Sequence, residues 1–192
     1  IKNGGYVLYN KILNKEVSFE KMIDTFSKAG LRGLGGAGFP AYKKWEIVKS
    51  YAGEKLMCIN ADEGEPGTFK DRYYLNKDPH RFLEGTLVAA ELVNAKKCYI
   101  YVRDEYYGLI KLLLQEISIL ENKNIVKKDF LEIRRGAGAY ICGEESALIE
   151  SIEGKRGLPR NRPPYVAEKG LFDKPTLVHN VETVYWIREI YE

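Results

Sequence analysis

Residues 29–45 read Ala-Gly-Leu-Arg-Gly-Leu-Gly-Gly-Ala-Gly-Phe-Pro-Ala-Tyr-Lys-Lys-Trp and place five glycines within nine positions. Because glycine lacks a Cβ, such a loop can reach positive φ and bring backbone N–H groups against a bulky ligand. Consecutive N–H groups form a concavity for anions, and the helix expected next adds its positive N-terminal end. A flexible surface linker is the alternative, but such linkers are polar rather than interleaved with Leu, Phe and Trp. The stretch therefore predicts a phosphate site, with Lys44, about one helical turn beyond Pro40, reaching back to it.

This loop matches neither of the two common glycine motifs in full. A Walker loop needs GxxxxGK followed by Ser or Thr, and neither Lys43 nor Lys44 lies in that frame. Residues 33–38 do fit G-x-G-x-x-G, but the dinucleotide fingerprint follows a strand, and residues 19–29 predict a helix. The sequence therefore indicates a nucleotide-binding loop of another design.

The rest of the chain alternates helical and strand patterns. Ser18 is a good helix N-cap, and apolar residues follow it at helical spacing from Phe19 to Phe26. Further helices are expected over 43–51, 79–95, 104–121, 145–152 and from about 179, and strands over 55–60, 97–102 and 130–133. This alternation predicts parallel strands covered by helices on both faces. We therefore expect an α/β, Rossmann-like three-layer fold with a mainly parallel sheet, as a single domain over residues 1–192.

Composition excludes several classes of function. The formal charge of +3 is small and no run of five like charges occurs, which argues against nucleic-acid binding. No apolar stretch approaches the roughly 18 residues of a membrane span, and no signal-peptide pattern opens the chain. Cys58, Cys98 and Cys142 form no CxxC pair, and there are only two histidines, so we expect neither disulfides nor a metal site. The start at Ile1 indicates a processed or cut N-terminus. A reducing cytoplasm is the expected compartment.

A second candidate stretch, residues 60–72, directly follows the strand expected over 55–60. Ligands of open α/β sheets bind at this carboxyl end of the strands. The amide of Asn60 offers a donor and an acceptor, and Asp62, Glu63 and Glu65 offer carboxylates. These acids could instead bind Mg²⁺ or simply be solvated. The Glu-Pro-Gly turn beside Asn60 favours a shaped binding site.

A third glycine-bearing stretch, residues 136–146, leads into the helix expected over 145–152. Glu144 and Glu145 are either capping charges at that helix or ligand-facing carboxylates. The basic turn that follows is an exposed connection or a lid that brings Arg162 near an anionic ligand. His179 and Asn180 open the last helix, and for His179 we favour a capping role.

Four stretches together carry a family resemblance: GLRGLGGAGFP, NADEGEPGTFKDR, GAGAYICGEE and HNVET, in that order. The chain resembles the NADH-binding flavoprotein subunit of respiratory complex I. It is similar also to the diaphorase subunits of NAD-dependent formate dehydrogenases and NAD-linked hydrogenases. The resemblance covers nearly all of residues 28–190.

The resemblance implies a bound FMN, an NADH that stacks over its ring, and an NADH:acceptor oxidoreductase. The implied FMN site comprises Gly33, Gly35, Gly36, Lys44, Asn60, Asp62, Glu63, Tyr140, Gly143, Glu144, Asn180 and Thr183. The implied NADH contacts are Phe39, Glu65, Glu145, Arg162 and Tyr165, the last two at the adenine end. No catalytic side chain is required, because the flavin carries the hydride.

The sequence departs from the complex I pattern at several of these positions. Leu34 replaces the usual Arg, and His179 replaces a usual Asn. Ile47 and Tyr165 stand where Phe residues commonly flank adenine. The variants at Leu34 and His179 look more like the formate dehydrogenase branch. They also motivate an alternative, a non-catalytic interaction module with a degenerate nucleotide pocket.

Family members continue into a ubiquitin-like domain and a helical domain that holds a 4Fe-4S cluster, and we expect both to lie outside this chain. The resemblance implies iron–sulfur partner subunits in an electron-transport complex, without direct membrane insertion of this chain. It implies a cytoplasmic location, with peripheral attachment to the inner face of the membrane through those partners. A flavin reductase that prefers NADPH is a further alternative. Glu65 and Glu145 favour NADH, because they would repel a 2′-phosphate.

Overall fold

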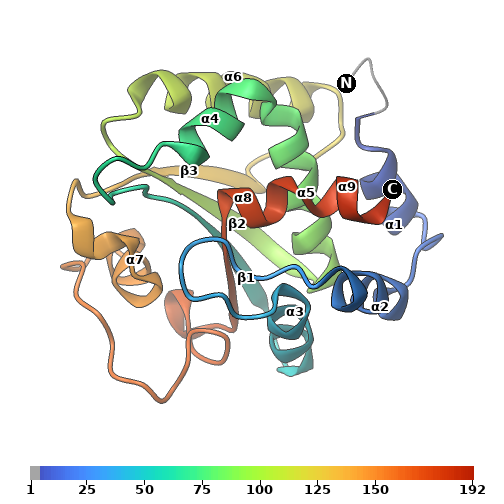
Figure 1. The fold of residues 1–192 in the computed structure, drawn as a ribbon, viewed down its shortest axis with the longest axis horizontal. Coiled ribbons are helices and arrows are strands. Elements are labelled where there is room, and N and C mark those ends of the chain that lie inside the picture. Colours follow the sequence, from blue (N-terminus) through green and yellow to red (C-terminus); the bar gives the residue numbers. More distant parts are fainter. Residues whose placement is uncertain (1–4) are drawn as a thin grey trace.

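A computed structural model describes residues 5–192 and contains one four-stranded sheet (Figure 1). The strands are β1 (Lys55–Ala61), β2 (Ala95–Val102), β3 (Leu131–Arg135) and β4 (Thr176–Asn180), in the order β3-β2-β1-β4. Every neighbouring pair is parallel, and Asn60 of β1 lies beside both Tyr101 of β2 and Asn180 of β4. The predicted parallel sheet is therefore confirmed.

Helices cover both faces of this sheet. The helices are α1 (Val7–Leu13), α2 (Phe19–Ala29), α3 (Ala41–Ser50), α4 (Lys70–Lys77), α5 (Pro79–Leu92), α6 (Tyr107–Asn122), α7 (Glu145–Ile152), α8 (Val181–Tyr185) and α9 (Ile187–Tyr191), with 3-10 turns at Tyr140–Gly143 and Leu171–Asp173. In Figure 1, α7 lies on the opposite side of the sheet from α4 and α6. None of the helices described over residues 5–192 is long and apolar enough to cross a membrane.

The core divides along the alternation of side chains in the strands. Met57 and Ile59 of β1 join a large cluster with α5 and α6, whereas Leu56 and Cys58 join a smaller cluster with α7. Successive side chains of a strand point to opposite faces, so a strand with both faces covered is apolar throughout. This packing confirms the expected three-layer α/β fold.

The helix before the glycine loop forms as predicted. The Ser18 hydroxyl accepts a hydrogen bond from the Lys21 N–H at 3.1 Å, and Met22 and Phe26 are fully buried on one face of α2. Gly30 ends the helix with φ of 68°, a conformation that favours glycine. A helix rather than a strand thus precedes the loop, which is why the loop departs from the dinucleotide fingerprint.

Three elements, α1, α4 and β4, were not predicted, and one capping interpretation was wrong. Asn180 does cap α8, accepting from the Glu182 N–H at 3.0 Å. His179 instead lies within β4, buried, where its Nε2 accepts from the indole N–H of Trp45 at 2.7 Å. Burial and the nearby Lys44 ammonium lower the pKa of His179 to about 3, so this imidazole stays neutral.

Candidate functional site

A cavity of about 510 Å³ lies at the carboxyl ends of the strands, where the sequence motifs converge. Its walls come from the glycine loop, the segment after β1, the start of α4, the 3-10 turn at Tyr140–Gly143 and the end of β4. The lining residues are Leu34, Gly35, Gly36, Asn60, Asp62, Glu63, Gly64, Glu65, Thr68, Lys70, Asp71, Tyr140, Ile141, Gly143, Glu144 and Asn180. Segments far apart in the sequence therefore form one site.

The glycine loop is held closed at its base and against α8 at its tip. The Gly33 N–H donates to the Phe39 carbonyl at 2.8 Å, and the Leu34 N–H donates to the Thr183 hydroxyl at 2.9 Å. A Cβ on Gly35 would lie 3.1 Å from the Asn180 Cβ, so glycine permits this close approach. The N–H groups of Gly35 and Gly36 have no acceptor within residues 5–192. They remain available to a ligand.

Asn60 joins the end of β1 to the opposite wall of the cavity. Its Nδ2 donates to the Gly143 carbonyl at 2.8 Å, and its Oδ1 accepts from the Asp62 N–H at 3.0 Å. Both polar ends of this amide are therefore used to hold the cavity walls in place.

Asp62 is a lining residue with one unsatisfied carboxylate oxygen. Its Oδ2 is buried and has no hydrogen-bond partner within the described residues. Burial raises the pKa of Asp62 from 3.8 to about 6, although the Arg103 guanidinium acts in the opposite direction. A donor on a ligand would satisfy this oxygen.

Glu63 lines the cavity, but its carboxylate serves the protein. It accepts hydrogen bonds from the Asp71 N–H at 3.1 Å, at the start of α4, and from the Tyr106 hydroxyl at 3.3 Å. Residues 5–192 contain no group of three or more His, Cys, Asp or Glu placed to hold a metal ion.

Lys70 and Asp71 are lining residues that our sequence reasoning did not select. Asn180 donates to the Asp71 carboxylate at 2.7 Å, and the Lys70 ammonium contacts both Asp71 at 2.6 Å and the Asn180 Oδ1 at 2.9 Å. Burial raises the pKa of Asp71. Lys70 and Asp71 lie near the end of the candidate stretch 60–72. The sequence pattern does not indicate which of its charged side chains line the cavity.

Glu144 caps α7 and also lines the cavity. One carboxylate oxygen accepts from the N–H groups of Ser146 at 2.9 Å and Ala147 at 3.0 Å, and the other contacts the Arg162 guanidinium. The capping interpretation is thus confirmed for Glu144, without excluding contact with a ligand.

Lys44, Glu145 and Arg162 form an ion-pair group beside the cavity, which we call the ionic rim. The Glu145 carboxylate lies 3.4 Å from the Lys44 ammonium and 3.5 Å from the Arg162 guanidinium. Lys44 also donates to the Val178 carbonyl at 3.3 Å. Lys44 lies outside the lining set, and its contact with a phosphate stays a prediction.

Tyr140 and Glu65 approach each other at the cavity. The Tyr140 hydroxyl donates to the Glu65 carboxylate, which raises the pKa of the phenol, and Tyr140 as a residue is 68% exposed. A Cβ on Gly64 would lie 3.5 Å from the Tyr140 ring. The exposed ring thus stands over residues 64–65, where an incoming ligand would meet it.

Four further predicted residues are not among those that line the cavity. Thr183 acts indirectly, through its hydrogen bond to Leu34, and Gly33 forms the base of the loop. Phe39 and Tyr165 are exposed side chains on neighbouring loops. Their contacts with NADH stay predictions.

Comparison with known proteins gives consistent results. Residues 26–189 match the family model described as the Nuo51 FMN-binding domain. An NADH-quinone oxidoreductase subunit of Aquifex aeolicus is 47% identical over 192 residues, covering 96% of this chain and 45% of the relative. An NADH-quinone oxidoreductase subunit of Rhizobium meliloti is 44% identical over 190 residues, which cover 94% of this chain and 45% of the relative. The chain thus spans less than half the length of these curated relatives.

Solved structures of an NAD⁺-reducing [NiFe]-hydrogenase have the same fold over this region. The H2-reduced structure matches with a TM-score of 0.88 and 41% identity, covering 97% of this chain and 32% of that one. The air-oxidised structure matches with a TM-score of 0.84 and 45% identity, and the match covers 90% of this chain and 30% of the hydrogenase chain.

Proposed function

This chain belongs to the family of the Nuo51 FMN-binding domain, and we propose that its cavity binds FMN and that the bound FMN exchanges a hydride with NADH. One observation carries the proposal: the glycine loop, residues 60–65 and residues 140–144 meet at a single cavity of about 510 Å³. That cavity lies at the carboxyl end of a parallel sheet, where ligands of such folds bind.

The residues present fit FMN in two respects. The free N–H groups of Gly35 and Gly36 are donors suited to a phosphate. The unpartnered Oδ2 of Asp62 is an acceptor suited to a hydroxyl or ring N–H. When bound, FMN supplies the redox chemistry of the reaction.

The side chains of this chain would bind and orient rather than react. Asn60 fixes the distance between β1 and the turn at Gly143, so the cavity is preformed and a ligand loses less freedom there. The lining set contains five acids, Asp62, Glu63, Glu65, Asp71 and Glu144, against the one base Lys70. Glu65 at the cavity and Glu145 at its edge would each repel a 2′-phosphate on a nucleotide bound there, so we propose NADH rather than NADPH as the donor.

We propose that electrons leave this flavin domain for iron–sulfur partner subunits of a larger complex. The relatives named above are subunits of NADH-quinone oxidoreductases and an NAD⁺-reducing hydrogenase, which favours these two settings over a formate dehydrogenase. Both settings agree with a location in the cytoplasm, where partner subunits would attach this chain peripherally to the membrane.

The test is to titrate FMN into the purified protein, follow flavin fluorescence, and then add NADH without oxygen. We expect saturable FMN binding, followed by bleaching of the flavin band. Riboflavin, which lacks the phosphate, should bind more weakly if the glycine loop holds that group. Failure to retain FMN at saturation, or a bound flavin that NADH does not bleach, would overturn the proposal.

A further inference from the structure

Between α7 and β4, residues 154–170 form a segment without helix or strand, which we call the strap. It carries Arg162 of the ionic rim, and it is mostly exposed, with Val166 and Gly170 buried (Figure 1, lower left). No strand ladder holds this segment. Two backbone hydrogen bonds fix its far end, from the Thr176 N–H to the Val166 carbonyl at 3.2 Å and from the Gly170 N–H to the Lys174 carbonyl at 2.8 Å, and side-chain contacts hold its middle.

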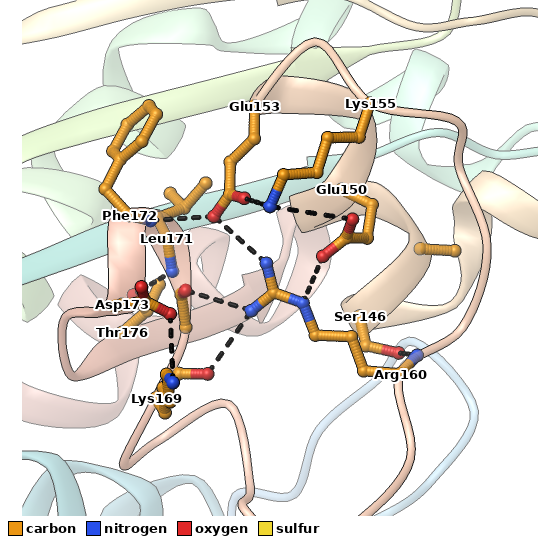
Figure 2. A network of polar contacts seen from close by, with 12 residues as sticks. Ser146, Glu150, Glu153, Lys155, Arg160, Lys169, Leu171, Phe172, Asp173 and Thr176 are labelled. Carbon is orange, nitrogen blue, oxygen red and sulfur yellow. Dashed lines mark hydrogen bonds and ion pairs between the residues drawn. The ribbon is translucent and has the colours of Figure 1, made fainter.

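Arg160 makes most of those contacts (Figure 2). Its guanidinium binds the carboxylates of Glu150 and Glu153 on and just after α7, the latter at 3.0 Å. On its other side it donates to the carbonyls of Gly170 at 3.0 Å and Lys169 at 3.3 Å, at the far end of the strap. Only Arg has a planar fork of donors that can serve four acceptors in this way.

The acceptors are themselves fixed. Glu153 has a side chain that is only 6% exposed, and it also accepts from the Phe172 N–H at 2.7 Å and from the Lys155 ammonium at 2.6 Å. The guanidinium is therefore clamped between the end of α7 and the far end of the strap, rather than lying free on the surface.

A hydrogen-bond chain connects this clamp to the cavity. The backbone N–H of Arg160 donates to the Ser146 hydroxyl at 2.9 Å, and that hydroxyl donates to the Glu144 carboxylate. Glu144 lines the cavity and contacts Arg162, two residues further along the strap. The position of Arg162 at the ionic rim thus follows from the position of Arg160.

We propose that Arg160 is a positioning residue for the nicotinamide nucleotide: it ties the strap to α7 and so holds Arg162 against Glu144 and Glu145. This inference rests on the proposed function, because it assigns the rim to the entering nucleotide. The FMN-facing groups of Gly35, Gly36 and Asp62 belong to other segments. Loss of the clamp should therefore weaken nucleotide binding while FMN binding and the hydride step stay intact.

The test compares Arg160→Gln and Glu153→Gln, which break the clamp from its two sides, with Arg188→Lys. Arg188 also pairs with two carboxylates, those of Glu192 at 3.0 Å and of the buried Glu84 at 3.7 Å, but lies on α9 outside the lining set. Hydrogen exchange of residues 154–170 is measured without flavin or nucleotide. The FMN Kd and the KM and kcat for NADH-dependent ferricyanide reduction are then measured on reconstituted protein.

We expect both clamp variants to speed exchange in the strap and to raise the KM for NADH about tenfold, the effect of about 1.4 kcal/mol of lost binding. Their kcat and FMN Kd should stay near the wild-type values, and Arg188→Lys should change none of these quantities. Arg160→Lys, which keeps the charge but loses the fork, should give an intermediate KM and serves if Arg160→Gln does not fold.

Two results would overturn the inference. If the clamp variants left both the hydrogen exchange of residues 154–170 and the KM for NADH unchanged, Arg160 would not position the strap or Arg162. If the clamp variants had a lower kcat, a weaker affinity for FMN and a lower unfolding midpoint together, Arg160 would have only a structural role. If the wild-type protein itself fails to bind FMN or to be reduced by NADH, the proposed function fails instead, and strap exchange in the flavin-free protein still tests the clamp.

Discussion

The Asp62 carboxylate combines two properties that conflict with stability. It is buried without a partner for Oδ2, and its pKa is raised to about 6. This carboxyl binds its proton more tightly in the folded state than in the unfolded state. The free energy of unfolding of the protein therefore falls as the pH rises from about 4 to about 6. This cost is expected at a position kept for ligand binding rather than for the fold.

We predict that Asp62→Asn stabilises the flavin-free protein at pH 7 and weakens FMN binding. The stability difference from wild type should grow between about pH 4 and pH 6, the window set by the ordinary and raised pKa values, and stay level above it. Urea unfolding across this range measures it. As a control, Asp24→Asn removes an exposed carboxylate paired with Lys28 and should not reproduce the rise. A flat difference for Asp62→Asn would contradict the prediction.

Helices α5 and α8 meet at a glycine. A Cβ on Gly85 would lie 1.9 Å from the Val184 carbonyl oxygen, so no side chain fits between the helices. The cavity depends on this contact, because Asn180 caps α8 and packs against Gly35, and Thr183 of α8 accepts the hydrogen bond from the Leu34 N–H of the glycine loop. The packing of two helices thereby sets the position of a binding loop distant in sequence.

We predict that Gly85→Ala lowers the free energy of unfolding by about 3 kcal/mol, the upper end of ordinary overpacking costs. It should also weaken FMN binding, because α8 must shift. Gly108→Ala in α6 is the matched control: its Cβ would meet nothing within 4 Å, and alanine should stabilise the helix by about 0.5 kcal/mol. Denaturant unfolding of both variants measures this. Equal stabilities would show that α5 and α8 do not pack this closely.

The whole molecule is organised so that one ligand contacts segments from across the chain. One cavity is lined by three segments: the glycine loop, residues 60–65 and residues 140–144. Few hydrogen bonds join these segments directly, the main ones being from Asn60 to Gly143 and from Tyr140 to Glu65. A bound FMN would link them through its own contacts. Ligand binding would then add stability to the entire fold.

We predict that FMN at 100 times its Kd raises the free energy of unfolding by about 2.7 kcal/mol. Hydrogen exchange should slow in all three segments together, while α1, which is remote from the lining set, should serve as the unaffected reference. Protection confined to a single segment would contradict the convergent site.

Local sequence was enough for most elements, for the glycine loop and for the family, because helix caps, apolar periodicity and turn glycines act over a few residues. The direction of each charged side chain was not readable in this way. Only the tertiary structure turned the Lys44 ammonium toward Glu145, the Glu63 carboxylate toward α4 and Asp71 toward the cavity. It also placed the polar, five-residue β4 beside β1, which buried His179. The physical reason is that most of these orientations depend on strand register and on partners far away in the sequence: Asn60 and Gly143 are 83 residues apart, and Trp45 and His179 are 134 residues apart. No local pattern encodes the identity of such partners.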